Sequence, residues 1–345
     1  RGKMTLAQKE NILNRIQTTG DAKDLKGCDL VIEAVFENRA LKAKVTQEAE
    51  EHLDKTVVFA SNTSTLPITG LAKQSQRPTQ FVGLHFFSPV HRMQLVEIIK
   101  GKKTDDKTLA KAFDYVLQVG KVPIVVNDSR GFYTSRVFST YTGEGMQLLA
   151  EGQHPQAIEM CGRLAGMPVG PLALLDEVSL KLVSDIRKQT IKDLGQQAKN
   201  DAMQKVLHIM VTENERFGKA KGAGFYEYPK GETKFLWPKL NELFKVEKSK
   251  QFEQKMMIER LMFAQAIETV RCLEEGVLTS SADANIGSIF GWGFAPFKGG
   301  TLQYINDYGM ADFVKRAKLL SKKFGKRFEP PAMLVEMAEA KKTFV

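Results

Sequence analysis

The sequence is poor in cysteine and has no long apolar run. Its three cysteines, Cys28, Cys161 and Cys272, are odd in number and lack the spacing of a metal site, so we expect no metal centre and a reducing, cytosol-like compartment. No window approaches the roughly 18 uninterrupted apolar residues of a transmembrane helix. The charged first segment does not have the pattern of a signal peptide. These absences indicate an ordinary intracellular globular protein.

Basic motifs interleaved with aromatic residues, which are typical of nucleic-acid binding, are also missing. The formal net charge is +10, but the basic residues are dispersed along the chain. We therefore expect no nucleic-acid partner. A small phosphorylated ligand needs only a local basic patch, and a solvated basic surface is the alternative explanation for the charge.

With 345 residues, 43% hydrophobic and 26% charged, the chain is large enough for two or three domains with real cores. Its first third alternates between strand and helix patterns, as in a doubly wound parallel sheet. In such sheets ligands bind at the carboxyl ends of the strands, where Glu37, Ser61 to Ser64 and His85 fall. The expected elements are helix 5–19, strand 29–36, helix 39–53, strand 56–60, helix 105–119 and strand 122–126.

The segment Phe81 to Lys100 contains two short apolar strands, FVGLHFF and QLVEII, joined by a turn with Ser88 and Pro89. Each strand carries one ionisable residue, His85 in the first and Glu97 in the second. Across a hairpin of this length the two side chains can meet. A carboxylate beside an imidazole fixes its tautomer and stabilises the imidazolium, as a general base near neutral pH requires. A buried pair with no catalytic role is the alternative.

From Gly131 onward the strand patterns stop and helical patterns continue almost to the C-terminus. Arg136–Gly152 matches Arg260–Gly276 in pattern at an offset of 124 residues, and the Gly/Pro-rich segments that follow also correspond. Two copies predict helical units that pack side by side, because a solenoid needs three or more. We expect three parts: a partial nucleotide-binding domain at 1–127, a first helical unit at 128–245 and a second at 246–345.

A dinucleotide-binding sheet normally begins with a strand and a Gly-x-Gly-x-x-Gly turn, then a second strand that ends in an acidic residue. Neither feature is present, because Gly222-x-Gly224 and Gly291-x-Gly293 lack the third glycine and follow no strand. The expected fold class is therefore an α/β Rossmann-like domain, N-terminally incomplete, followed by an all-α domain of two repeated helical units.

The motifs ASNTSTL, GLHFFSPV, LVEII, Asp-x-x-Gly-Phe before the long helix, and GMPVGP resemble L-3-hydroxyacyl-CoA dehydrogenases. The tandem helical units are most similar to the dehydrogenase half of the multifunctional fatty-acid oxidation α-subunit, which carries an enoyl-CoA hydratase domain ahead of it. The resemblance covers essentially the whole chain and implies an N-terminally truncated form of that enzyme.

The resemblance implies that the protein oxidises L-3-hydroxyacyl-CoA to 3-ketoacyl-CoA with NAD. His85 would be the base, Glu97 would orient and stabilise it, and Ser64 would hydrogen-bond the substrate oxygen near the nicotinamide. Glu37 and Lys42 match positions at the nicotinamide-ribose side. For Ser64, a helix cap before Pro67 is the alternative role.

Two positions depart from the family pattern. Ser135 and Ser88 stand where the family commonly has asparagine, and a serine is shorter and offers fewer donors than an amide. If these serines contact the substrate, we expect them to change the preference for the acyl chain rather than the type of reaction.

The resemblance also implies a homodimer, a possible complex with a thiolase subunit, and a location in the bacterial cytoplasm or, in a eukaryote, in the mitochondrion or peroxisome. Two alternatives stay open. One is a stand-alone 3-hydroxybutyryl-CoA dehydrogenase, against which the second helical copy argues. The other is a catalytically inactive truncated or scaffold fragment.

Overall fold

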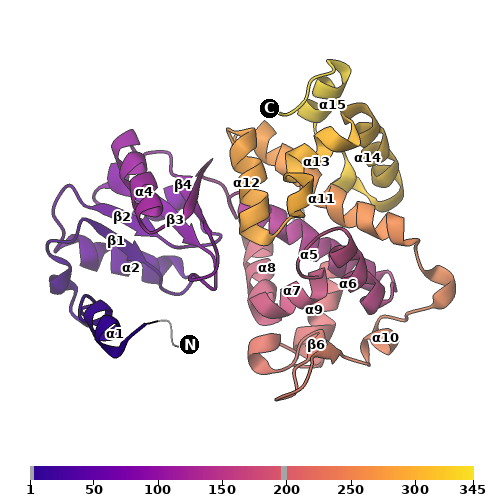
Figure 1. The fold of residues 1–345 in the computed structure, drawn as a ribbon, viewed down its shortest axis with the longest axis horizontal. Coiled ribbons are helices and arrows are strands. Elements are labelled where there is room, and N and C mark those ends of the chain that lie inside the picture. The colour runs from indigo at the N-terminus through magenta and orange to yellow at the C-terminus, as the bar shows by residue number, and fades with distance from the viewer. Residues whose placement is uncertain (1–3, 196–199) are drawn as a thin grey trace.

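The computed structural model describes residues 4–195 and 200–345, which form a sheet domain followed by two helical units (Figure 1). The sheet has the order β1-β2-β3-β4-β5, with every neighbouring pair parallel except the antiparallel pair β3/β4. Its strands are β1 (Leu30–Glu33), β2 (Val58–Ser61), β3 (Phe81–Phe86), β4 (Leu95–Lys100) and β5 (Val122–Asn127). The helices of this part are α1 (Leu6–Leu13), α2 (Arg39–Glu50), α3 (Ile68–Ala72) and α4 (Asp106–Gln118), with short turns at Ala22–Leu25 and Pro78–Gln80.

Both faces of the sheet are covered. One face packs on α4, through Ala112 and Val116 against Val82 and Ile98. The other face is continuous with the core of the helical units, and there Phe59 and Phe81 stack with ring centroids 5.5 Å apart. This burial on both faces explains why the strands are apolar runs without alternation.

The structure confirms the predicted hairpin, the strand at 122–126 and the helix at 105–119, which Asp105 caps by accepting from the Thr108 N–H. Three predicted elements are too long. The strand at 29–36 stops at Glu33, because the Glu33 carboxylate accepts the N–H of Val35 and turns the chain out of the sheet. The helix at 39–53 ends at Glu50, and the helix at 5–19 ends at Leu13.

The helix at the N-terminus, α1, is capped by Thr5, whose side chain accepts the N–H of Gln8, but its apolar positions are exposed. Nothing in the described part of the chain covers Leu6, Ile12 and Leu13. Because most helical stability in proteins comes from packing of an apolar face, the helical pattern past Leu13 is not realised as helix.

The helical units pack against each other through their two longest helices, α5 and α11. The first helical unit comprises α5 (Thr134–Ala150), α6 (Pro155–Leu164), α7 (Pro171–Val178), α8 (Leu180–Leu194) and α9 (Asp201–Leu207), continued by a π-helical turn at His208–Glu213. The second comprises α11 (Gln254–Glu274), α12 (Ser281–Trp292), α13 (Thr301–Tyr308), α14 (Met310–Phe324) and α15 (Ala332–Glu339). The connector between them contains β6 (Tyr226–Glu227), β7 (Phe235–Leu236) and α10 (Leu240–Leu243), and short turns lie at Lys219–Lys221, Lys248–Lys250, Pro296–Lys298 and Lys326–Phe328.

The two units repeat each other in backbone detail. Ser179, between α7 and α8, has φ 92° and ψ 115°, and Gly309, between α13 and α14, has φ 90° and ψ 119°. The Glu159 carboxylate accepts the N–H groups of Leu172 and Ala173 at the start of α7. Asn285 Oδ1 accepts those of Leu302 and Gln303 at the start of α13. The repeat seen in the sequence is therefore a repeat of the fold.

Reciprocal ion pairs join α5 to α11. Arg260 of α11 donates from Nε to Glu144 (2.6 Å) and from Nη1 to Glu151 (2.6 Å). Arg136 of α5 donates to Glu268 and, from Nη1, to Glu275 (2.5 Å). The offset of 124 residues converts the first set into the second, as expected for an interface with an internal two-fold axis. Arg260 is fully buried, so its partners must neutralise it.

We predict that Arg260→Met lowers the free energy of unfolding by about 3 kcal/mol, because the buried Glu144 carboxylate loses one of its two arginine partners and retains only Arg327. Urea unfolding followed by circular dichroism measures this. Lys181→Met is the control, since Lys181 and Asp185 form an exposed pair whose loss costs at most about 1 kcal/mol. Equal losses in the two variants would contradict the prediction.

Burial raises the pKa of Glu159, although hydrogen bonds from Tyr226, Leu172 and Ala173 oppose that shift. A carboxyl whose pKa is higher in the folded state stabilises the fold below its unfolded pKa of about 4.3 and loses that contribution as pH rises. Since the neutral amide of Asn285 does the same work in the second unit, we predict that Glu159→Gln gains stability relative to wild type as pH rises above about 4.3. Thermal melts at a series of pH values between 4 and 8 test this, and a pH-independent difference would contradict it.

Candidate functional site

His85 and Glu97 face each other directly across the β3/β4 pair. His85 Nδ1 lies 3.0 Å from Glu97 Oε2. His85 is 6% exposed, with its ring against Phe87 (centroids 4.4 Å apart), and Glu97 is completely buried. Because an ionised carboxylate only accepts hydrogen bonds, Nδ1 carries the proton and Nε2 presents its lone pair. The pair therefore has the arrangement of a general base with an orienting carboxylate.

The start of α5 supplies the remaining partners of Glu97. The N–H groups of Tyr133 (2.9 Å) and Thr134 (3.0 Å) donate to Oε1, and the Thr134 hydroxyl donates to Oε2 (2.6 Å). The N-terminus of a helix favours an anion, because its first N–H groups are free and its dipole is positive there. These donors allow Glu97 to be buried as a carboxylate.

A second cluster surrounds Glu37, which follows β1. The Thr63 hydroxyl donates to the Glu37 carboxylate (2.7 Å), as do the Ser64 N–H (2.9 Å) and hydroxyl (3.2 Å). Lys42 Nζ lies 3.5 Å from its other oxygen. The buried Lys42 orients the Glu37 carboxylate from the protein interior. The Glu37 side chain is itself 30% exposed, so a ligand in solvent can reach it.

Lys42 is anchored beneath this cluster by Glu33. Its ammonium lies 3.0 Å from both Glu33 oxygens and 3.2 Å from the Val35 carbonyl, and each of the two side chains is 2% exposed. The Ser61 hydroxyl also donates to Glu33. Lys42 therefore positions Glu37 from inside the protein.

The two clusters lie at the same edge of the sheet, because β1, β2 and β3 are parallel and end together. The loop after β2 is hydrogen-bonded to the end of β3 and to the segment before α5. Asn62 Oδ1 accepts the N–H of Phe86 (2.8 Å), and the Thr65 carbonyl accepts the N–H of Gly131 (3.2 Å). The structure thus brings His85, Glu97, Ser64, Glu37 and Lys42 to one edge.

The other two candidates lie beside this edge. Ser135 is half-buried in the first turn of α5, and Ser88 is exposed in the loop after β3. Ser64 does not cap α3, since Asp128 accepts the N–H groups of Ile68 (2.8 Å) and Thr69 (2.7 Å). Two residues of these clusters, Thr134 and Glu33, were not predicted from the sequence, whereas Thr63 lies within the range Ser61 to Ser64 that was. A lone glutamate in an apolar strand was a usable signal for Glu33, whereas nothing local marks Thr134.

The residues present fit the nicotinamide end of a dinucleotide. An oriented, accessible carboxylate at the end of a parallel strand, as Glu37 is, can accept hydrogen bonds from ribose hydroxyls. Residues 4–195 and 200–345 contain no group of three or more His, Cys, Asp or Glu side chains that could hold a metal ion. In the same residues no helix is long and apolar enough to cross a membrane.

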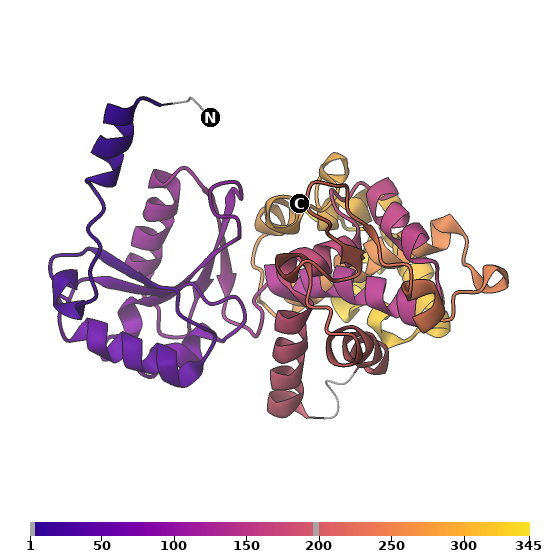
Figure 2. The same cartoon turned by 90° about the horizontal axis from the view of Figure 1, so that it is seen from below.

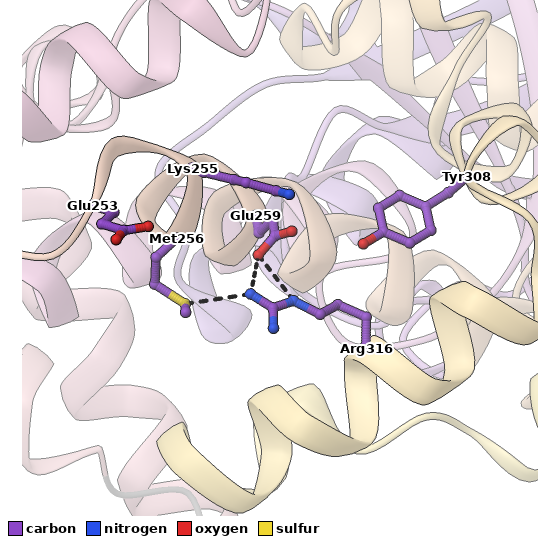
Figure 3. Close-up of a pocket in the computed structure, with 6 residues that line it drawn as sticks. All are labelled: Glu253, Lys255, Met256, Glu259, Tyr308 and Arg316. Atoms are coloured by element: carbon purple, nitrogen blue, oxygen red, sulfur yellow. Dashed lines mark hydrogen bonds and ion pairs between the residues drawn. The ribbon is translucent and has the colours of Figure 1, made fainter.

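A cavity of about 330 Å³ in the second helical unit carries none of this chemistry (Figure 3). It is lined by Glu253, Lys255, Met256, Glu259, Tyr308 and Arg316. Arg316 Nε donates to Glu259 (3.0 Å), so the two charges neutralise each other. The offset of 124 makes Glu259 the counterpart of Ser135, which shows that the units have diverged at this position.

Comparison with known protein families gives two matches. Residues 1–129 match the 3-hydroxyacyl-CoA dehydrogenase NAD binding domain, and residues 131–228 match the 3-hydroxyacyl-CoA dehydrogenase C-terminal domain. The fatty acid oxidation complex subunit alpha of Shewanella putrefaciens is 39% identical over 99% of this chain, which spans 48% of that protein. The chain thus spans about half the length of the curated relatives it matches.

Two solved structures are also similar. The (S)-3-hydroxybutyryl-CoA dehydrogenase of Ralstonia eutropha is 36% identical, with 66% of this chain and 80% of that chain covered and a TM-score of 0.61. The 3-hydroxybutyryl-CoA dehydrogenase of Escherichia coli shares the fold over 98% of this chain and 87% of that chain, with a TM-score of 0.81 at 21% identity. The second match extends through both helical units.

We predict that Lys42→Met lowers the free energy of unfolding by about 3–5 kcal/mol, because it leaves the buried Glu33 carboxylate unpaired. Lys44→Met is the matched control on the same helix, since Lys44 is exposed and its pair with Glu48 contributes about 0.5 kcal/mol or less. Chemical unfolding measures both. If the two variants are equally stable, the Lys42 ammonium is not held as described.

Proposed function

Since this chain belongs to the 3-hydroxyacyl-CoA dehydrogenase family, we propose that it oxidises L-3-hydroxyacyl-CoA to 3-ketoacyl-CoA with NAD. The observation that carries the proposal is the His85–Glu97 contact of 3.0 Å, next to the Glu37 cluster at the carboxyl edge of the sheet. Alcohol oxidation by hydride transfer needs a base for the hydroxyl proton and a bound nicotinamide that takes the hydride; His85 offers the first, and Glu37 offers a hydrogen-bond acceptor for the cofactor's ribose.

His85 performs the proton transfer. Its Nε2 lone pair accepts the proton of the 3-hydroxyl as the C3–H bond breaks and carbonyl character develops at C3. NAD, when bound, supplies the acceptor for the hydride that leaves C3. In the reverse direction the imidazolium returns its proton to the substrate oxygen.

Glu97 stabilises the imidazolium that this step creates. Its negative charge lies against Nδ1–H, so the positive ring has a partner inside the protein rather than in water. The donors at the start of α5 hydrogen-bond both oxygens of Glu97 and fix its position. The base is thereby held in one tautomer and one orientation.

The remaining site residues bind and orient. Glu37 receives the nicotinamide ribose, with Lys42 holding it from beneath. The Ser64 hydroxyl donates to Glu37 in this structure; with substrate bound it turns to donate to the substrate oxygen or the nascent carbonyl. Ser88 and Ser135 contact the substrate, and because serine is shorter than asparagine they affect acyl preference rather than the type of reaction.

The relative named fatty acid oxidation complex subunit alpha supports a role within a larger enzyme. We propose that the chain is the dehydrogenase region of a hydratase/dehydrogenase of fatty-acid β-oxidation, with residues 1–127, 128–245 and 246–345 as its three parts. A homodimer, contact with a thiolase subunit and a cytoplasmic location belong to the same proposal. The Ralstonia eutropha relative supports one alternative, oxidation of the short 3-hydroxybutyryl-CoA by a stand-alone enzyme.

We predict that His85→Gln lowers kcat for 3-hydroxyacyl-CoA oxidation in the full-length enzyme by about two to four orders of magnitude, the contribution of a general base. His91→Gln is the control, since His91 lies exposed in the same hairpin loop. Absorbance of NADH at 340 nm measures both rates. Near-normal turnover of the His85→Gln enzyme would refute the assignment of the base.

A further inference from the structure

We propose that α12, in the second helical unit, is a positioning element of the His85–Glu97 dyad, which it reaches through Tyr133 and Thr134. This inference rests on the proposed function, because it concerns the same base. No residue of the second unit was assigned to the site. Figures 1 and 2 nevertheless show α12 at the edge of the helical part that faces the sheet, where it packs on β4, β5 and α5.

Tyr133 is fixed by α12 on several sides. It is fully buried, and its hydroxyl donates to the Ala284 carbonyl (2.7 Å). Its ring meets Trp292 edge to face, with centroids 5.4 Å apart. At Gly287 a Cβ would lie 2.9 Å from Tyr133 Cε1, so only glycine allows this approach.

Thr134 is in contact with the same helix one turn further along. A Cβ at Gly291 would lie 3.3 Å from Thr134 Cγ2 and 3.1 Å from Leu95 Cδ2. A glycine inside a helix costs about 1 kcal/mol relative to alanine, so two of them on one face of α12 indicate close packing as the reason. The methyl group of Thr134 touches α12 while its hydroxyl holds Glu97.

The contacts form a short chain from α12 to the base. The N–H groups of Tyr133 and Thr134 both donate to Glu97 Oε1, and Glu97 Oε2 lies against His85 Nδ1. These two residues begin α5, so no preceding helical turn fixes their peptide groups. The side chains that anchor them are packed on α12. A shift of α12 therefore moves Tyr133 and Thr134, and these two residues are bonded directly to Glu97.

The second unit is also tied to the sheet itself. The Asn127 N–H donates to the Val277 carbonyl (2.8 Å), and Asn127 Nδ2 donates to the Gly276 carbonyl (2.8 Å). Both bonds join the end of β5 to the turn between α11 and α12. The internal repeat produces the equivalent contact from the other unit: α6 of the first unit packs on α11 of the second, as α12 of the second packs on α5 of the first. Only the start of α5, however, holds a catalytic carboxylate.

The test is Gly291→Ala in the full-length enzyme, assayed as 3-hydroxyacyl-CoA oxidation. The added methyl would lie 3.3 Å from Thr134 Cγ2, so Thr134 has to shift by a few tenths of an ångström, which moves the hydroxyl that holds Glu97. We expect kcat to fall about tenfold or more, with KM for the acyl-CoA and NADH binding within twofold, since sub-ångström to 1 Å displacements of catalytic groups have effects of this size. Gly70→Ala is the matched control, because Gly70 also lies in a helix, α3, and a Cβ added there meets no atom within 4 Å.

Rescue distinguishes positioning from a general loss of structure. Thr134→Ser removes Cγ2, the Thr134 atom that lies nearest the new methyl, and keeps the hydroxyl that binds Glu97; the remaining close contact is with Leu95 Cδ2, the end of a flexible side chain. The double variant Gly291→Ala/Thr134→Ser should therefore regain kcat relative to Gly291→Ala alone, which makes a double-mutant cycle with a non-zero coupling. If Gly291→Ala does not fold, Tyr133→Phe replaces it and should lower kcat in the same selective way, because it removes the hydroxyl that donates to Ala284 (2.7 Å) and lies 3.4 Å from the Thr301 hydroxyl.

Two outcomes would overturn the inference. One is a Gly291→Ala enzyme with wild-type kcat, and the other is a loss of kcat that Thr134→Ser does not relieve at all. In both cases His85→Gln still abolishes turnover if the proposed function holds. A His85→Gln enzyme that stays active refutes the proposed function itself, so the two failures are distinct.

Discussion

The burial of one carboxylate, Glu97, connects every part of this structure. A buried charge is tolerated only when charged or polar partners surround it. The partners of Glu97 come from two separate elements, with His85 on the neighbouring strand and Tyr133 and Thr134 at the start of α5. The sheet and the first helical unit must therefore meet at this point for the chain to fold. The proposed catalytic dyad is also the place where the two are joined.

The second helical unit extends this dependence. It contributes no group to the dyad, yet it covers the residues that hold Glu97 and bonds to the end of β5. Its own position is set by the reciprocal ion pairs of Arg136 and Arg260 between α5 and α11. A pair of units related in this way buries a long shared face, which explains why α5 and α11 are the longest helices of the described chain.

The nucleotide side of the site follows the same principle. Glu37 is accessible because Lys42 and Thr63 orient it from below, and Lys42 is buried because Glu33 neutralises it. The partly exposed Glu37 carboxylate is thus supported by two buried side chains, Lys42 and Glu33. Such support fixes the geometry before binding, so less order has to be gained when the ligand arrives.

The sequence by itself determined the alternation of strands and helices, the His85–Glu97 hairpin and the internal repeat. These features are local or periodic: burial on both faces gives apolar strands, and a repeated unit keeps its spacing. The family motifs added the identity of the candidate residues. Element ends were less well determined, because β1 stops where the Glu33 side chain captures the N–H of Val35 rather than where hydrophobicity declines.

Tertiary structure alone decided which distant groups meet. Thr134 is 37 residues from Glu97 in the sequence, and Gly291 is much further from both. In the structure Thr134, at the start of α5, lies between the Glu97 carboxylate and the glycine face of α12. No local pattern encodes that meeting, since it depends on how α5 and α12 pack against the sheet. The same holds for Lys42, whose burial against Glu33 could not be read from its position in the sequence. Contacts between elements arise from packing, and packing is a property of the whole chain.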